Sequence, residues 1–81
     1  IELEKTGATT QSRRIADGQT VNGALEFYDV TDSATRLLIN GSGKIGIGEN
    51  SPDEILHVNS GTSNGCLKLE STDSQADLYC W

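Results

Sequence analysis

The 81-residue sequence has few of the residues that build a hydrophobic core. Apolar residues make up 35% of it and aromatic residues only 5%, whereas glycine, serine, threonine and asparagine together fill 30 positions. A chain of this length buries a modest share of its surface even when its core is rich. We therefore expect it to depend on a disulfide, a metal ion or other chains for its stability.

Long apolar runs and positive charge are also scarce. The longest uninterrupted apolar stretch, residues 78–81, is too short for a transmembrane helix. No basic start precedes an apolar stretch, so no secretory signal is visible. Six basic residues against twelve acidic ones give a net charge of −6, which argues against binding to nucleic acid. Because the last residues are the most apolar, we expect the sequence to be a piece of a longer polypeptide.

Only two cysteines are present, Cys66 and Cys80, which allow at most one disulfide. Both align with apolar positions of the internal repeat described below, so we interpret them as small, buried, reduced thiols. A disulfide across a hairpin is the alternative, and the lack of an export signal argues against it.

The apolar residues alternate with a period of two, which is typical of β-strands. Leu25 and Phe27, for example, share one face of a predicted strand, and Ile45 and Ile47 share one face of another. Residues 30–33 form the predicted turn between the second and third strands, and residues 6–20 show no clear pattern. The pattern predicts strands at residues 1–5, 24–29, 36–39, 44–48, 55–58, 66–70 and 78–81.

The stretch Asn40-Gly41-Ser42-Gly43 predicts a tight hairpin turn. Asn-Gly between two apolar runs is a strong hairpin signal because both residues accept positive φ, so we expect Gly41 to need that geometry. Gly41, Gly43 and Gly46 also match the spacing of a dinucleotide-binding loop, but that loop requires a helix after it. The residues that follow alternate as a strand, which favours the hairpin.

Two further local signals follow the hairpin. Gly46 and Gly48 leave one face of their strand without side chains, which lets another backbone approach closely. Ser51 and Pro52 predict a helix start of about one turn, with Ser51 as its cap and Glu54 reaching back to complete a capping box.

No residue is assigned to catalysis. The stretch at 61–65 matches the glycine and serine spacing of a nucleophile elbow, but a strand-like segment follows it where a helix is required. The only histidine, His57, also precedes the serine. The simplest interpretation of His57 is a strand residue, and in a threefold assembly three copies of it could converge on a metal ion or an anion.

An internal repeat organises the chain. Residues 22–25 (NGAL) line up with 64–67 (NGCL) at a spacing of 42, and residues 31–33 line up with 72–74 at a spacing of 41. We divide the chain into an N-terminal strand with a polar connection (1–21), one β-repeat unit (22–63) and the start of the next repeat (64–81). One unit cannot bury its own apolar face, so neighbouring units or chains must do so.

Residues 36–58, RLLINGSGKIGIGENSPDEILHV, closely resemble a repeat common in bacteriophage tail fibres and in phage-like trimeric bacterial adhesins. The matching parts are residues 44–48 (KIGIG), Ser51-Pro52 and residues 56–58 (LHV), whereas Glu49-Asn50 replaces a usual pair of small threonines. The resemblance implies an all-β fold of repetitive hairpin and strand segments in an intertwined, fibrous, parallel homotrimer.

The same resemblance implies a structural segment of a tail fibre shaft that serves attachment to the host cell. Such a segment is not an enzyme, needs no cofactor, does not insert in membranes and belongs to the virion after assembly in the host cytoplasm. Its partners are two further copies, other tail proteins and, through the whole fibre, a host-surface glycan or protein. The alternative is a carbohydrate-binding tip or a fibre-to-baseplate adaptor, with Tyr28 and Trp81 as candidate receptor contacts and Phe27 packed inside. A polysaccharide-degrading tailspike fragment has no support beyond the acidic residues.

Overall fold

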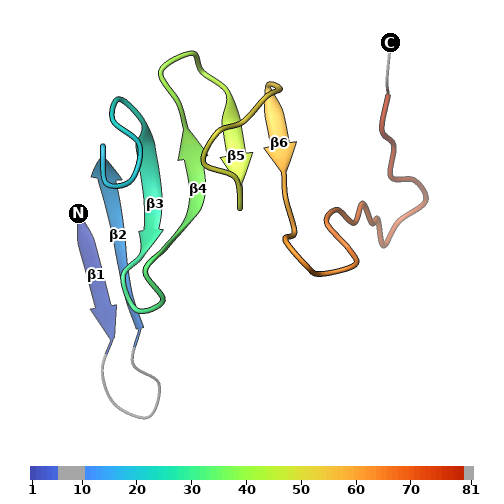
Figure 1. The fold of residues 1–81 in the computed structure, drawn as a ribbon. Helices are drawn as coiled ribbons and strands as arrows, with labels where there is room; N and C mark the ends of the chain where they lie inside the picture. The colour runs from blue at the N-terminus through green and yellow to red at the C-terminus, as the bar shows by residue number, and fades with distance from the viewer. Residues whose placement is uncertain (6–10, 80–81) are drawn as a thin grey trace.

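The computed structural model describes residues 1–5 and 11–79, which form a single six-stranded sheet (Figure 1). The strands follow one another across the sheet in chain order, and every neighbouring pair is antiparallel except β5 and β6, which are parallel. The predicted all-β class is confirmed, since the described residues contain no helix. The strands are β1 (Glu2–Lys5), β2 (Gln11–Asp17), β3 (Leu25–Asp29), β4 (Ala34–Ile39), β5 (Ile45–Ile47) and β6 (Leu56–Val58).

Five of the six strands lie where alternation predicts them, and β2 arises from the segment without a clear pattern. The strand predicted at residues 66–70 is wrong, because residues 59–79 contain no strand and run away from the sheet (Figure 1). The strand predicted at 78–81 falls partly outside the described residues, as do Cys80 and Trp81. Cys66 is exposed, so its predicted burial is wrong.

The register of the strands gathers the large apolar side chains on one face of the sheet. Ile15 of β2 pairs with Phe27 of β3, which pairs with Leu37 of β4. In the next row of side chains, Leu25 of β3 pairs with Ile39 of β4. Paired residues of neighbouring strands point to the same side. We call this side the apolar face, and its members are Leu3, Ile15, Leu25, Phe27, Leu37, Ile39, Ile45, Ile47, Leu56 and Val58.

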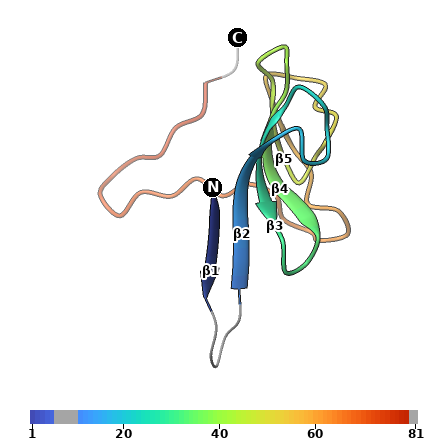
Figure 2. The ribbon, with the colours of Figure 1, turned by 90° about the vertical axis from the view of Figure 1, so that its left-hand side faces the viewer.

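No described part of the chain buries the apolar face. Phe27 is 43% exposed and Leu56 is 54% exposed in the single chain, so the predicted packing of Phe27 inside stays a prediction about an assembly. The only fully buried apolar residues of the described part are Ala24 and Leu38. Leu38 lies on the opposite side, which we call the covered face, where it pairs with Glu26 and Gly46. Figure 2 shows the β2–β3 loop and the β5–β6 connection on the same side of the sheet.

Glycines allow the β5–β6 connection to lie close to the sheet. A Cβ atom at Gly46 would collide with the backbone carbonyl of Glu49, and one at Gly48 would collide with that of Asn59. Gly48 also has a φ of 70°, which side chains rarely adopt. The predicted close backbone approach is therefore confirmed, and the backbone that approaches belongs to the same chain.

The helix predicted to start at Ser51-Pro52 is wrong, because residues 48–55 form an irregular connection between two parallel strands. Ser51 donates its backbone N–H to the Glu49 carboxylate (3.1 Å), and Asp53 donates its own to Nδ1 of His57 (3.2 Å). The buried Pro52 lies between them. A short connection must carry the chain back along the sheet. An extended residue spans about twice the distance of a helical one, so an extended path suits this connection better than a helix.

The hairpin predicted at residues 40–43 is confirmed, but its geometry differs from the expected one. The Gly43 N–H donates to the Asn40 carbonyl (2.9 Å), and Oδ1 of Asn40 accepts from the Ser42 and Lys44 N–H groups. Gly43 has a φ of 86°, whereas Gly41 is not among the residues with positive φ. This is a three-residue loop whose last residue is left-handed, so the prediction for Gly41 was wrong.

Alanine at Gly43 and alanine at Gly41 should therefore have different effects. Gly43→Ala forces a left-handed conformation on a residue with a side chain and should destabilise the fold by about 1–2 kcal/mol. Gly41→Ala meets only the Gly23 carbonyl at 3.7 Å, so it should be neutral or slightly stabilising. Urea unfolding followed by circular dichroism measures both, and equal losses would contradict this turn geometry.

Candidate functional site

The residues singled out in the sequence lie in separate places. Asn40, Gly41 and Gly43 form the β4–β5 turn, and Gly46 and Gly48 pack beneath the β5–β6 connection. These glycine and turn residues shape the backbone, and side chains converge elsewhere in the sheet. They form an ion cluster with a hollow beside it, a buried carboxylate, a polar hollow and a contact between His57 and Glu49.

The ion cluster surrounds Asp29, which is 1% exposed at the end of β3. Arg13 donates to one carboxylate oxygen (3.0 Å), and Arg36 donates to the other through Nη2 (2.9 Å) and Nε (3.2 Å). The register shift between β3 and β4 leaves Arg36 without a partner residue and aims it at this carboxylate. The backbone N–H of Asp32 also donates to Asp29, a local hydrogen bond that is typical of a turn aspartate.

The Asp29 cluster is held in its ionised form. Burial by itself would raise the pKa of the Asp29 carboxyl, but the Asp32 N–H and the guanidinium groups of Arg36 and Arg13 outweigh it. The pKa therefore lies below its ordinary value. Arg36 forms a second ion pair with Asp32 (3.0 Å), so the positive charges of the cluster are largely matched.

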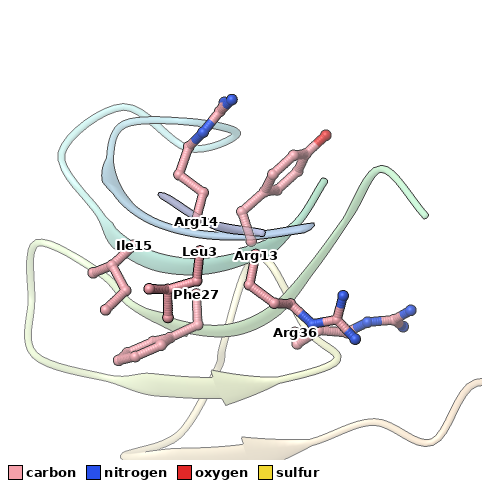
Figure 3. A pocket seen from close by; sticks show the side chains of 7 residues that line it. Leu3, Arg13, Arg14, Ile15, Phe27 and Arg36 are labelled. Atoms are coloured by element: carbon pink, nitrogen blue, oxygen red, sulfur yellow. The ribbon is translucent and has the colours of Figure 1, made fainter. Parts of the chain in front are cut away.

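A hollow of about 290 Å³ lies beside this cluster, and side chains from both sides of the sheet line it. Figure 3 shows Leu3, Ile15 and Phe27 on one side of the sheet and Arg14 pointing away from them. The hollow is mainly apolar, with guanidinium groups at its rim. Its lining residues are Leu3, Arg13, Arg14, Ile15, Phe27, Tyr28 and Arg36.

The buried carboxylate is Glu26, whose side chain is fully enclosed on the covered face. Its Oε2 accepts the backbone N–H groups of Thr20 (2.7 Å) and Val21 (2.9 Å), and its Oε1 accepts the Thr35 hydroxyl (2.8 Å). Burial raises the pKa of Glu26, but these hydrogen bonds outweigh it and the pKa falls below its ordinary value. The carboxylate thus ties the β2–β3 loop to the sheet.

A polar hollow of about 650 Å³ opens near this loop. Its wall includes the half-buried ring of Tyr28, and Ser33 on its rim has a φ of 54°, which is uncommon for a residue with a side chain. Hydroxyl, amide and carboxylate groups surround the aromatic ring. The lining residues are Thr20, Tyr28, Ser33, Ala34, Thr35, Gly48, Glu49 and Asn50.

His57 contacts Glu49 at the edge of the β5–β6 connection. Its Nε2 is 3.8 Å from a Glu49 oxygen, which also accepts from the Asn59 amide (3.0 Å). The Asn59 amide, the Ser51 N–H and the charge of His57 lower the pKa of Glu49 despite partial burial. Within residues 1–5 and 11–79, no group of three or more histidine, cysteine, aspartate or glutamate side chains could hold a metal ion. A threefold site at His57 stays a prediction.

No protein-family model, curated protein or solved structure matches the chain. None of the described residues form a helix that is long and apolar enough to cross a membrane. Two features of the described sheet bear on function: an uncovered apolar face with an ion cluster at its edge, and a polar hollow on the other side.

We expect the Glu26 clamp to make folding sensitive to acid. A carboxyl whose pKa is lower in the folded chain than in the unfolded chain stabilises the fold at pH values above its unfolded pKa, 4.5. This stabilisation disappears as the pH falls through the lower pKa of the folded chain. Glu26→Gln should cost about 1 kcal/mol at neutral pH, because the loop N–H groups lose a charged acceptor, and should remove part of the acid dependence. Glu54→Gln, at an exposed glutamate, is the control. Urea midpoints across the acidic range measure both, and identical profiles would contradict the clamp.

Proposed function

We propose that this chain is a structural segment of a bacteriophage tail fibre shaft in which three parallel copies pack through their apolar faces. The observation that carries the proposal is the uncovered apolar face. A monomeric protein rarely exposes a contiguous apolar patch larger than a few hundred Å², and a larger one marks an interaction surface. The apolar face crosses the whole sheet and is covered by nothing in the described chain.

A second copy of the same chain is the occupant that best fits this face. The arginines at its edge are already paired with Asp29, so the face offers apolar side chains rather than unmatched charge. The chain cannot offset its conformational entropy with a core of Ala24 and Leu38. Packing three faces together supplies the missing apolar burial.

Gly46 and Gly48 lie outside the proposed contact between chains. Gly46 and Gly48 accommodate backbone of their own chain, so contact between chains runs through side chains of the apolar face. Each copy carries a net charge of −6, so added salt should strengthen the trimer slightly by screening. The proposed setting is the virion, with assembly in the host cytoplasm and with other tail proteins and a host-surface glycan or protein as further partners.

Light scattering coupled to size exclusion should give the mass of three chains. Ile47→Asp places a carboxylate in the middle of the apolar face and should weaken association at least about tenfold, because burying an unpaired charge is costly. Ile55→Asp is the matched control, since Ile55 is 71% exposed outside that face and should tolerate the change.

Two outcomes would contradict different parts of this proposal, one the trimer itself and the other the face through which it forms. A wild-type monomer that unfolds cooperatively at micromolar concentration would defeat the fibre proposal. A trimer that Ile47→Asp leaves intact would keep the assembly and reject the apolar face as its interface.

The polar hollow favours a second candidate function, the binding of a carbohydrate. Sugars pack a ring face against an aromatic side chain and pair their hydroxyl groups with polar side chains, and Tyr28 lies among such groups here. The half-buried Tyr28 lines the hollow, so its ring is the surface that a sugar ring would contact.

A glycan array probed with the assembled protein tests this function. Binding should fall at least about tenfold in Tyr28→Ala and stay unchanged in Tyr79→Ala, whose ring is 72% exposed outside the hollow. An array without any signal, or equal losses in the two variants, would reject the carbohydrate site.

A further inference from the structure

The dipeptide Asn-Gly occurs three times in this chain, in three different structural settings. The pairs are Asn22-Gly23, Asn40-Gly41 and Asn64-Gly65. Asparagine before glycine is chemically labile, because a glycine nitrogen without a neighbouring side chain can approach the asparagine amide freely. Whether the reaction occurs depends on whether the local fold lets the two groups meet.

The reaction is intramolecular and needs only water. The backbone nitrogen of the glycine loses its proton to solvent and attacks Cγ of the asparagine. A C–N bond forms, the bond from Cγ to the amide nitrogen breaks, and ammonia leaves. Water then opens the resulting five-membered imide on either side, which gives aspartate or isoaspartate and restores the proton.

Asn40 is held away from this reaction by its own hydrogen bonds. Its Oδ1 accepts the N–H groups of Ser42 (3.0 Å) and Lys44 (2.9 Å). Its backbone carbonyl accepts the N–H group of Gly43 (2.9 Å). Its backbone N–H donates to the Lys44 carbonyl. Attack by the Gly41 nitrogen would require all of these bonds to rearrange together.

Asn22 is restrained by the turn that contains it. The Ala24 N–H donates to the Val21 carbonyl (3.1 Å), and Gly23 has a φ of 86°. The Glu26 carboxylate holds the same loop through the Val21 N–H. The backbone around Asn22 is therefore fixed in a turn rather than free to rotate toward the imide geometry.

Asn64 follows a turn in which Ser60 and Ser63 bond to each other, but neither Asn64 itself nor the Gly65 nitrogen makes a hydrogen bond among the described residues. It is exposed, no hydrogen bond to the described residues holds its amide, and a Cβ atom placed on Gly65 would meet nothing within 4 Å. We propose that Asn64 is a site of spontaneous deamidation, whereas the fold protects the same dipeptide at Asn22 and Asn40. The product adds a negative charge, and isoaspartate also adds a methylene to the backbone at the start of the second repeat.

Peptide mapping by mass spectrometry, after incubation of the whole protein at neutral pH, measures all three sites in one sample. Asn64 should convert at least about tenfold faster than the other two, because their reaction requires local opening first. The same incubation in concentrated urea should bring the three rates together. Equal rates in buffer, or a faster rate at Asn22 or Asn40, would overturn the proposal.

A variant at the attacking residue tests the mechanism without disturbing the fold. Gly65→Ala adds a side chain in open space at a residue whose φ is not positive, so the structure should accept it. Conversion at Asn64 should slow at least about tenfold, because the new Cβ hinders the approach of the nitrogen. An unchanged rate in this variant would reject the imide route.

Discussion

The carboxylate of Glu26 decides which face of the sheet is covered. It accepts two backbone N–H groups of the β2–β3 loop and a hydroxyl from β4, and so holds this loop against the sheet. The β5–β6 connection lies on the same side, where Gly46 leaves room for it. Because both loops are held on that side, the apolar side chains on the other side are left without cover. The exposed apolar face thus depends on a polar interaction on the opposite face.

The second repeat lacks the carboxylate that anchors the loop of the first. At the repeat spacing of 42, Lys68 takes the place of Glu26. A lysine donates hydrogen bonds and cannot accept the loop N–H groups, so the Glu26 clamp is not repeated at this position. Residues 66–70 alternate like a strand in sequence and form none in the structure.

The sequence predicts the strands better than it predicts what covers them. Alternation and the Asn-Gly turn are local signals, so most strands and the hairpin at 40–43 could be placed from them. The strand β2 (Gln11–Asp17) could not, because two arginines interrupt its pattern, and their partners lie on other strands: Arg13 pairs with Asp29 of β3, and Arg14 pairs with Glu2 of β1. The capping signals at Ser51-Pro52 did not produce a helix, since Glu49 of the connection and His57 of β6 accept its backbone N–H groups instead. The burial of Glu26 likewise follows from contacts that no local pattern contains.

The two candidate functions use opposite sides of a sheet one layer thick. Neighbouring residues of a strand point to opposite faces, so Phe27 belongs to the apolar face and Tyr28 to the side of the polar hollow. Association of three copies through the apolar face would bury Phe27 and leave Tyr28 facing outward. A shaft assembled in this way would therefore present three polar hollows around its surface, and assembly would repeat the ligand site rather than compete with it.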